Sequence, residues 1–127
     1  MNFIDAVKSY FVKWNDFKTR SSRSEYWWAT LFSTLASIVS QLVNAAIASN
    51  PSALTLTIAI LILILLIFMF IASLALVVRR LHDLDKSGWW YLLIFTIIGI
   101  IPLIIWYCSK GTEGQNRFGE DPLSERF

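Results

Sequence analysis

The sequence predicts an all-α integral membrane protein, and the distribution of its charges carries this prediction. The 127 residues are 56% hydrophobic and only 16% charged, whereas soluble domains average about 25% charged residues. The charged residues fall in 1–25, 79–86 and 110–126, and the uncharged blocks among them are 26–53, 54–78 and 87–109. A helix of about 20 apolar residues crosses a hydrocarbon core of about 30 Å. Each uncharged block is therefore long enough to span a membrane.

The rest of the composition excludes several kinds of site and partner. The single cysteine, Cys108, excludes an internal disulfide and cannot form a zinc site alone. Asp5 and Lys8 interrupt the first apolar run, so the N-terminus does not resemble a cleaved signal peptide. The net charge is only +2 and the basic residues are dispersed, which argues against a nucleic-acid partner. No metal and no cofactor is expected, and the expected partner is the lipid bilayer.

Residues 2–17 predict an amphipathic helix in the headgroup plane, because apolar side chains recur at helical spacing in a segment too polar to span. These side chains are Phe3, Ile4, Val7, Phe11, Trp14 and Phe17. The same face could instead pack against the protein's own membrane helices, and both arrangements can hold together.

Three transmembrane helices are predicted, over 27–48, 53–78 and 89–108. Ser22 and Glu25 form a capping box before the first, and the uncharged turn SNPS joins it to the second. The interfacial anchors expected for these spans are Trp27, Trp28, Trp89 and Trp90. A stripe of small polar side chains on the first span favours close helix packing more than a substrate path. The stripe consists of Ser33, Ser37, Ser40 and Asn44.

The third span is ambiguous, and so is the side of the turn-rich tail at 109–127. Gly99 and Pro102 lie inside this span, where Pro102 predicts either a kink or a break into a re-entrant segment. Three full spans would place the tail and the 79–90 loop on opposite faces of the membrane. A segment that turns back would bring the polar motifs together on one face.

The distribution of Lys and Arg predicts a cytoplasmic N-terminus. The segment before the first span carries five of these residues, the turn after it none, and the loop at 79–88 three. The tail carries three basic residues against four acidic ones, so charge does not assign its side.

The stretch RRLHDLDKSGWW at 79–90 supports two interpretations. In the first, Arg79 and Arg80 bind a phosphate or carboxylate while His82 and Asp83 transfer protons. In the second, the stretch is a polar hinge whose arginines end a span at the phosphate level and whose tryptophans anchor the next span. The residue types alone favour the hinge.

Three segments, TRSSRSEYWW, RRLHDLDKSGWW and CSKGTEGQNRFGEDP, resemble in order and spacing the YhaH/YhaI-type bacterial inner-membrane family, catalogued as domain of unknown function 805. The resemblance covers nearly the whole chain, although the family prefers glycine where Thr19 stands and tyrosine where Phe118 stands. It implies a bacterial plasma membrane, a small polytopic helical fold and no established enzyme activity or cofactor. A polar signature repeated in three interfacial segments exceeds what membrane anchoring requires. The resemblance therefore supports a binding site at 79–90 as much as a polar hinge.

The expected function is that of a non-enzymatic inner-membrane module whose cytoplasmic face binds anionic lipid headgroups or a membrane partner, either another protein or a second copy. Two alternatives stay open. One is a membrane-embedded enzyme or lipid-intermediate carrier built on Arg80, His82 and Asp83, with Arg117 contributing. The other is an oligomeric channel or small transporter. The candidate ligand- or lipid-binding residues are Arg20, Arg23, Glu25, Arg79, Arg80, His82, Asp83, Asn116 and Arg117.

Overall fold

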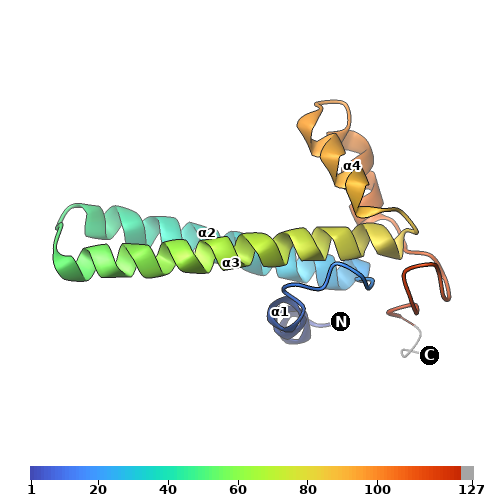
Figure 1. Ribbon diagram of the computed structural model, residues 1–127, viewed down its shortest axis with the longest axis horizontal. Coiled ribbons are helices and arrows are strands. Elements are labelled where there is room, and N and C mark those ends of the chain that lie inside the picture. The colour runs from blue at the N-terminus through green and yellow to red at the C-terminus, as the bar shows by residue number, and fades with distance from the viewer. Residues whose placement is uncertain (124–127) are drawn as a thin grey trace.

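The computed structural model describes residues 1–123, and this part of the chain is helical with no β-strand (Figure 1). The last four residues of the predicted tail lie outside the described residues. The elements are α1 (Phe3–Val12), α2 (Arg23–Ala48), α3 (Ala53–Asp83), the 3₁₀ helix η1 (Gly88–Phe95) and α4 (Ile100–Cys108).

Helices α2 and α3 form a long antiparallel hairpin, and both are long and apolar enough to cross a membrane. The prediction of helices in these two segments is confirmed, with both helices longer than expected. Helix α2 starts at Arg23 because the Ser22 side chain caps it, accepting a hydrogen bond from the Glu25 N–H. Ser52 and Thr55 form a full capping box at the start of α3. Helix α3 continues to Asp83 as its last turn packs inside the protein.

Helix α1 is shorter than the predicted 2–17, and the chain turns away after it. The Asp16 carboxylate accepts hydrogen bonds from the backbone N–H groups of Lys18 and Thr19, at 3.0 and 3.1 Å. Partial burial acts to raise the pKa of Asp16, but these bonds and one from the Thr19 hydroxyl lower it below its ordinary value. A carboxylate held in this way closes a tight turn, so the helix cannot continue through it.

The apolar face of α1 packs against the hairpin, which confirms the packing alternative. Tyr10 is fully buried, and its hydroxyl donates to the Met69 carbonyl at 2.8 Å. Phe11 contacts the rings of Phe32 and Phe68 at centroid distances of 5.5 and 6.1 Å. These contacts place the hydrophobic core at one half of the hairpin, where α1, α2, α3 and α4 meet.

The segment 89–108 is not one helix, contrary to the prediction of a third span. The break lies at 96–99, where the Thr96 hydroxyl donates to the Leu93 carbonyl and accepts from the Gly99 N–H. A β-carbon at position 99 would collide with both groups, so the turn requires glycine. Pro102 does not kink a helix, because it lies in the first turn of α4, where a missing N–H leaves no bond unmade.

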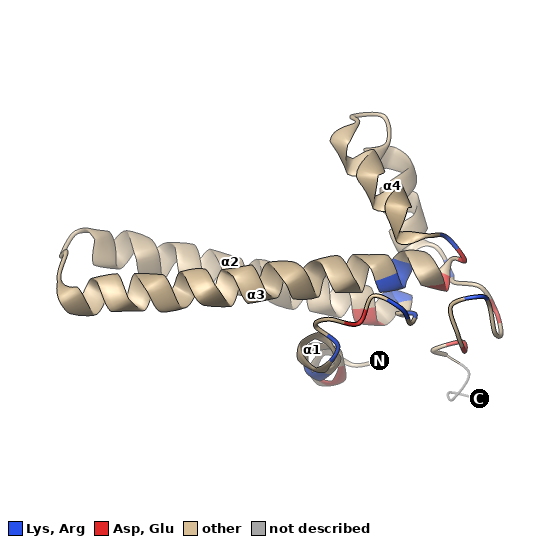
Figure 2. Ribbon diagram, in the orientation of Figure 1, with Lys and Arg blue, Asp and Glu red and all other residues tan. Residues whose placement is uncertain are grey.

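We call residues 88–108 the apolar arm: η1 leads outwards and α4 returns alongside it. The rings of Trp90 and Trp106 meet edge to face at 5.7 Å within the arm. The arm leaves the hairpin near the end of α3, on the side away from α1 (Figure 1). The charged residues of the described chain gather at this same end, which we call the polar end (Figure 2).

Candidate functional site

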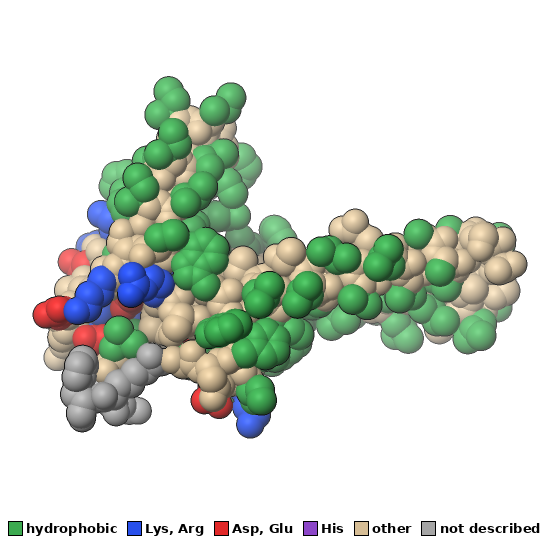
Figure 3. Space-filling model, turned by 180° about the vertical axis from the view of Figure 1, so that it is seen from behind, with side chains coloured by type: hydrophobic (Ala, Val, Ile, Leu, Met, Phe, Trp, Pro, Cys, Tyr) green, Lys and Arg blue, Asp and Glu red, His purple; other side chains and the backbone are tan. Residues whose placement is uncertain are grey.

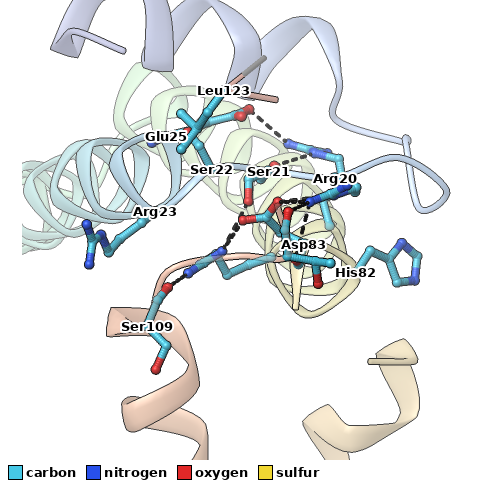
Figure 4. A network of polar contacts seen from close by, with 12 residues as sticks. Arg20, Ser21, Ser22, Arg23, Glu25, His82, Asp83, Ser109 and Leu123 are labelled. Atoms are coloured by element: carbon cyan, nitrogen blue, oxygen red, sulfur yellow. Dashed lines mark hydrogen bonds and ion pairs between the residues drawn. The ribbon is translucent and has the colours of Figure 1, made fainter. Parts of the chain in front are cut away.

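All nine candidate site residues lie at the polar end, and they come from three separate segments of the chain. Because the arm turns back, residues 20–25, 79–83 and 112–119 meet there, as predicted for a re-entrant third segment. Figure 4 shows Arg20, Asp83 and Ser109 within the network of polar contacts. Six of the nine residues are buried, namely Arg20, Glu25, Arg79, Arg80, His82 and Asp83. Arg23, Asn116 and Arg117 lie nearer the surface.

Asp83, the last residue of α3, holds two arginines together. One carboxylate oxygen accepts from Arg20 Nε at 3.1 Å, and the other accepts from Arg80 Nη1 at 2.5 Å. These three side chains are at most 4% exposed. Charged groups this deep are stable only when paired and fully hydrogen-bonded. We call Arg20, Glu25, Arg79, Arg80 and Asp83 the arginine cluster.

Arg80 connects α3 to the end of the apolar arm. The last carbonyls of a helix have no partner within it and carry the negative end of its dipole. Arg80 donates to the carbonyls of Trp106, Tyr107 and Ser109, the first two at 3.4 Å. The same guanidinium donates to the Ser21 carbonyl at 3.4 Å. One side chain therefore caps α4 and fixes the arm against the segment before α2.

Arg20 holds the tail in the same way. Its terminal nitrogens donate to the carbonyls of Thr112 at 2.5 Å, Gly114 at 2.7 Å and Gly119 at 3.2 Å. The tail also binds α3 directly, since the Thr112 N–H donates to the Asp83 carbonyl at 2.7 Å. Gly111 passes so close to the Asp83 carboxylate that a β-carbon there would overlap it.

Arg79 holds the segment between α1 and α2. Its Nη1 donates to the Lys13 carbonyl at 2.7 Å and to the Asp16 carbonyl at 3.1 Å, and its Nε donates to the Ser21 hydroxyl at 2.9 Å. Nη2 lies 3.8 Å from Glu25 Oε1, close enough for charge pairing but beyond hydrogen-bond reach. Each of the three buried arginines thus binds the backbone of a different segment.

Glu25 does not complete the capping box predicted with Ser22. Its carboxylate instead accepts from the Ser9 hydroxyl of α1 at 2.6 Å, beside Arg79. The acid therefore joins α1 to α2 and balances a buried cation, which a local pattern of four residues does not reveal.

His82 and Asp83 are neighbours in sequence but do not pair. His82 Nδ1 lies 3.0 Å from the Thr19 carbonyl, and its ring stacks on Phe118 at 3.8 Å. A carbonyl only accepts, so Nδ1 carries the proton in this contact. Asn116 adds a hydrogen bond from its amide to the His82 carbonyl at 2.9 Å. Histidine and tail are therefore held against each other at the edge of the cluster.

Three of the four predicted anchors, Trp27, Trp89 and Trp90, lie at the base of the arm, whereas Trp28 contacts the ring of Phe3 in α1 at a centroid distance of 5.8 Å. Trp27 Nε1 donates to the Tyr107 carbonyl at 3.1 Å, and Arg23 donates to the Cys108 carbonyl at 3.1 Å. Lys86 Nζ lies 4.6 Å from the centroid of Trp106. Tryptophans and cations in contact at one level are typical of a membrane–water interface.

The polar stripe predicted on the first span contributes nothing to this site. The hydroxyls of Ser33 and Ser40 donate to the carbonyls of Thr30 and Ser37 in their own helix. Sequence reasoning missed Ser9 and Ser21, both contacts of the cluster. No local signal separates them from the other serines. Among residues 1–123, no group of three or more His, Cys, Asp or Glu side chains could hold a metal ion.

Most of the chain is similar to known proteins. The family model described as "Protein of unknown function (DUF805)" matches residues 14–120, which include the arginine cluster and the arm. Inner membrane protein YhaI of Escherichia coli (strain K12) is 34% identical over 121 residues, 94% of this chain and 93% of that protein. Inner membrane protein YhaH of the same strain is 34% identical over 128 residues, 97% of each chain. No solved structure matches. The chain belongs to the DUF805 family, whose similar members YhaI and YhaH are inner membrane proteins.

Proposed function

We propose that the protein is a non-enzymatic module of the bacterial inner membrane that binds anionic lipid headgroups at its polar end. In this proposal α2 and α3 cross the membrane and the polar end faces the cytoplasm. The names of YhaI and YhaH support the membrane, and the excess of Lys and Arg before α2 supports the orientation.

The observation that carries the proposal is the position of Arg23 and Lys86. Both lie at the base of the apolar arm, where Arg23 reaches the end of α4 and Lys86 covers Trp106. Neither belongs to an ion pair within residues 1–123, whereas Lys110 and Arg117 are paired with Glu113 and Asp85. Unpaired cations at the level where tryptophans begin are suited to lipid phosphates.

The buried arginines are less suited to this task than the sequence suggested. Arg79 and Arg80 are 0% exposed, and Arg20 is 3% exposed. Their donors are directed at backbone carbonyls and carboxylates of the protein itself. In the proposal they hold the binding face together, and Arg23 and Lys86 contact the lipid.

The test replaces Arg23 and Lys86 together by glutamine in the full chain. Each cation near an anionic surface contributes about 1 kcal/mol, so affinity for phosphatidylglycerol should fall about tenfold or more for the pair. Native mass spectrometry of protein released from mixed phosphatidylglycerol–phosphatidylcholine nanodiscs measures the retained lipid.

The matched control replaces Lys110 and Arg117 by glutamine, which removes the same formal charge from ion-paired positions. This control should retain phosphatidylglycerol nearly as well as the parent protein. Equal losses in the two double variants would mean that only net charge matters, and no loss in either would end the proposal.

The rival proposal of an enzyme or lipid-intermediate carrier uses Arg80, His82 and Asp83. It has less support, because both Asp83 oxygens already accept from arginines and the His82 Nδ1–H is directed at the Thr19 carbonyl. A general acid–base pair needs its two groups within hydrogen-bond reach of a common substrate. We therefore prefer the non-enzymatic module.

A further inference from the structure

We infer that the protein is a wedge in the bilayer, wider in the leaflet at its polar end, and that it gathers where that leaflet is expanded by curvature. The inference goes beyond headgroup binding. It rests on one premise of the proposed function, that α2 and α3 cross the membrane.

The two halves of the hairpin differ in cross-section. The half farther from the polar end contains only α2 and α3, and it is slender in the space-filling view (Figure 3). At the other half α1 packs against α2 and α3, and the arm packs against the hairpin without touching α1. Figure 1 shows α1 and the arm on opposite sides of the hairpin. The protein therefore widens on two sides at one end only.

The arm is too short to cross the membrane at any tilt. Its nine-residue α4 is about 13 Å long at 1.5 Å per residue. Its eight-residue η1 is about 16 Å long at 2.0 Å per residue. Half of a hydrocarbon core of about 30 Å is about 15 Å. Because the base of the arm is fixed at the polar end by Arg80 and the arm runs across the hairpin rather than along it (Figure 1), its tip stays in the polar-end leaflet.

We infer that the surface of the arm contacts the lipid acyl chains of the leaflet at the polar end. Phe95, Ile97 and Ile98 at its tip are 82%, 89% and 82% exposed. A continuous apolar surface of this kind is unfavourable in water. The base carries Trp106 and Lys86 in contact, as expected for a segment anchored at the interface of that leaflet.

Helix α1 adds to the same leaflet from the other side. Its Ile4 and Val12 are 62% and 77% exposed, beyond the face that packs on the hairpin. Interfacial amphipathic helices bind membranes in a curvature-sensitive way, because they insert among the lipids of one leaflet. Among residues 1–123, α1 and the arm both insert into the polar-end leaflet, and only α2 and α3 lie in the opposite leaflet. The protein should therefore be more stable in a membrane whose polar-end leaflet is on the convex side.

The test measures sorting between flat and tubular membrane. The full chain carrying Cys108→Ser and Gln115→Cys is reconstituted into giant vesicles of neutral phosphatidylcholine, since residue 115 is exposed in the tail. A membrane-impermeant fluorescent maleimide then labels only molecules whose polar end faces outwards. On narrow tubes pulled from these vesicles, the labelled protein should be enriched about twofold or more relative to a lipid dye.

The matched variants change the arm tip, whose side chains are mostly exposed. Replacement of Phe95, Ile97 and Ile98 by serine should reduce the enrichment, whereas replacement of all three by leucine should preserve it. Unchanged resistance of the tail to trypsin shows that the serine variant is folded.

Two results would overturn the inference: equal densities of the parent protein on tube and vesicle, or a serine variant that turns a dimer into a monomer by single-molecule counting. The second result would make the arm an interface between copies. Neutral lipid removes headgroup attraction from the assay, so failure of the proposed function would leave the sorting intact.

Discussion

Replacement of Asp83 by asparagine is expected to destabilise the protein by about 3–5 kcal/mol, because it leaves two buried guanidinium groups without a counter-charge. Arg20 and Arg80 both pair with this carboxylate, and all three side chains are at most 4% exposed. The midpoint of heat-induced aggregation in detergent micelles, measured by size-exclusion chromatography, should fall clearly.

Asp85→Asn is the matched control for this prediction. Asp85 pairs with Arg117 at 3.3 Å, but the two side chains are 49% and 61% exposed. An exposed pair contributes about 0–1 kcal/mol, so this variant should behave almost as the parent protein. Similar midpoints for Asp83→Asn and Asp85→Asn would contradict a stabilising role of the arginine cluster.

Arg80→Lys keeps the positive charge, but it is expected to weaken the attachment of the arm and the tail to α3. A lysine has three N–H donors on one nitrogen and cannot replace all the hydrogen bonds of Arg80. These go to the Asp83 carboxylate and to the carbonyls of Ser21, Trp106, Tyr107 and Ser109. A hydrogen bond to a charged group contributes about 1.5–3 kcal/mol, so losing even one should raise the open population about tenfold or more. Trypsin cleavage after Lys110, followed by intact mass, measures that population.

Arg117→Lys provides the comparison, because it makes the same exchange at an exposed arginine of the tail. The rate of cleavage after Lys110 should stay within about twofold of the parent rate, as expected for an exposed pair. If the two exchanges accelerated cleavage equally, Arg80 would not be the residue that holds the arm.

The periodic and compositional features of the chain were predictable from sequence. Long uncharged runs predicted the two helices of the hairpin, and Ser22 indicated the start of α2 to within a few residues. The spacing of Phe3, Val7 and Phe11 predicted a helix that can pack on other helices, and Phe3 and Phe11 contact α2. These properties depend on neighbours within one or two turns, so a single sequence contains them.

The fold-back of the arm was predictable only as an alternative. Length and apolarity in 89–108 are equally compatible with a straight span. What decides against the span is the combination of Thr96 and Gly99 in one turn with Arg80 capping the returning helix. The capping contact between Arg80 and the Trp106 carbonyl joins residues 26 positions apart, so no local sequence pattern predicts it.

The nature of the site was also beyond the sequence. Arg79, Arg80 and His82 were expected to face a ligand or the lipid surface, but they are buried and bind backbone carbonyls. An arginine beside an apolar run has the same sequence pattern whether it reaches outwards or inwards. Its direction depends on whether other segments supply acceptors, and here the returning arm and the tail supply them.

The polar segments 20–25, 79–83 and 112–119 form one structure. The most direct test of this is to determine on which side of the membrane the C-terminus lies. Paired reporters fused after Phe127, one active only in the cytoplasm and one only in the periplasm, report that side. The same pair inserted at Asn50, in the turn between α2 and α3, is the internal control and should report the periplasm. Because the arm turns back, the C-terminal fusions should show activity only for the cytoplasmic reporter. Activity of the periplasmic reporter alone would mean that residues 88–108 cross the membrane, and the arginine cluster could not then hold the tail.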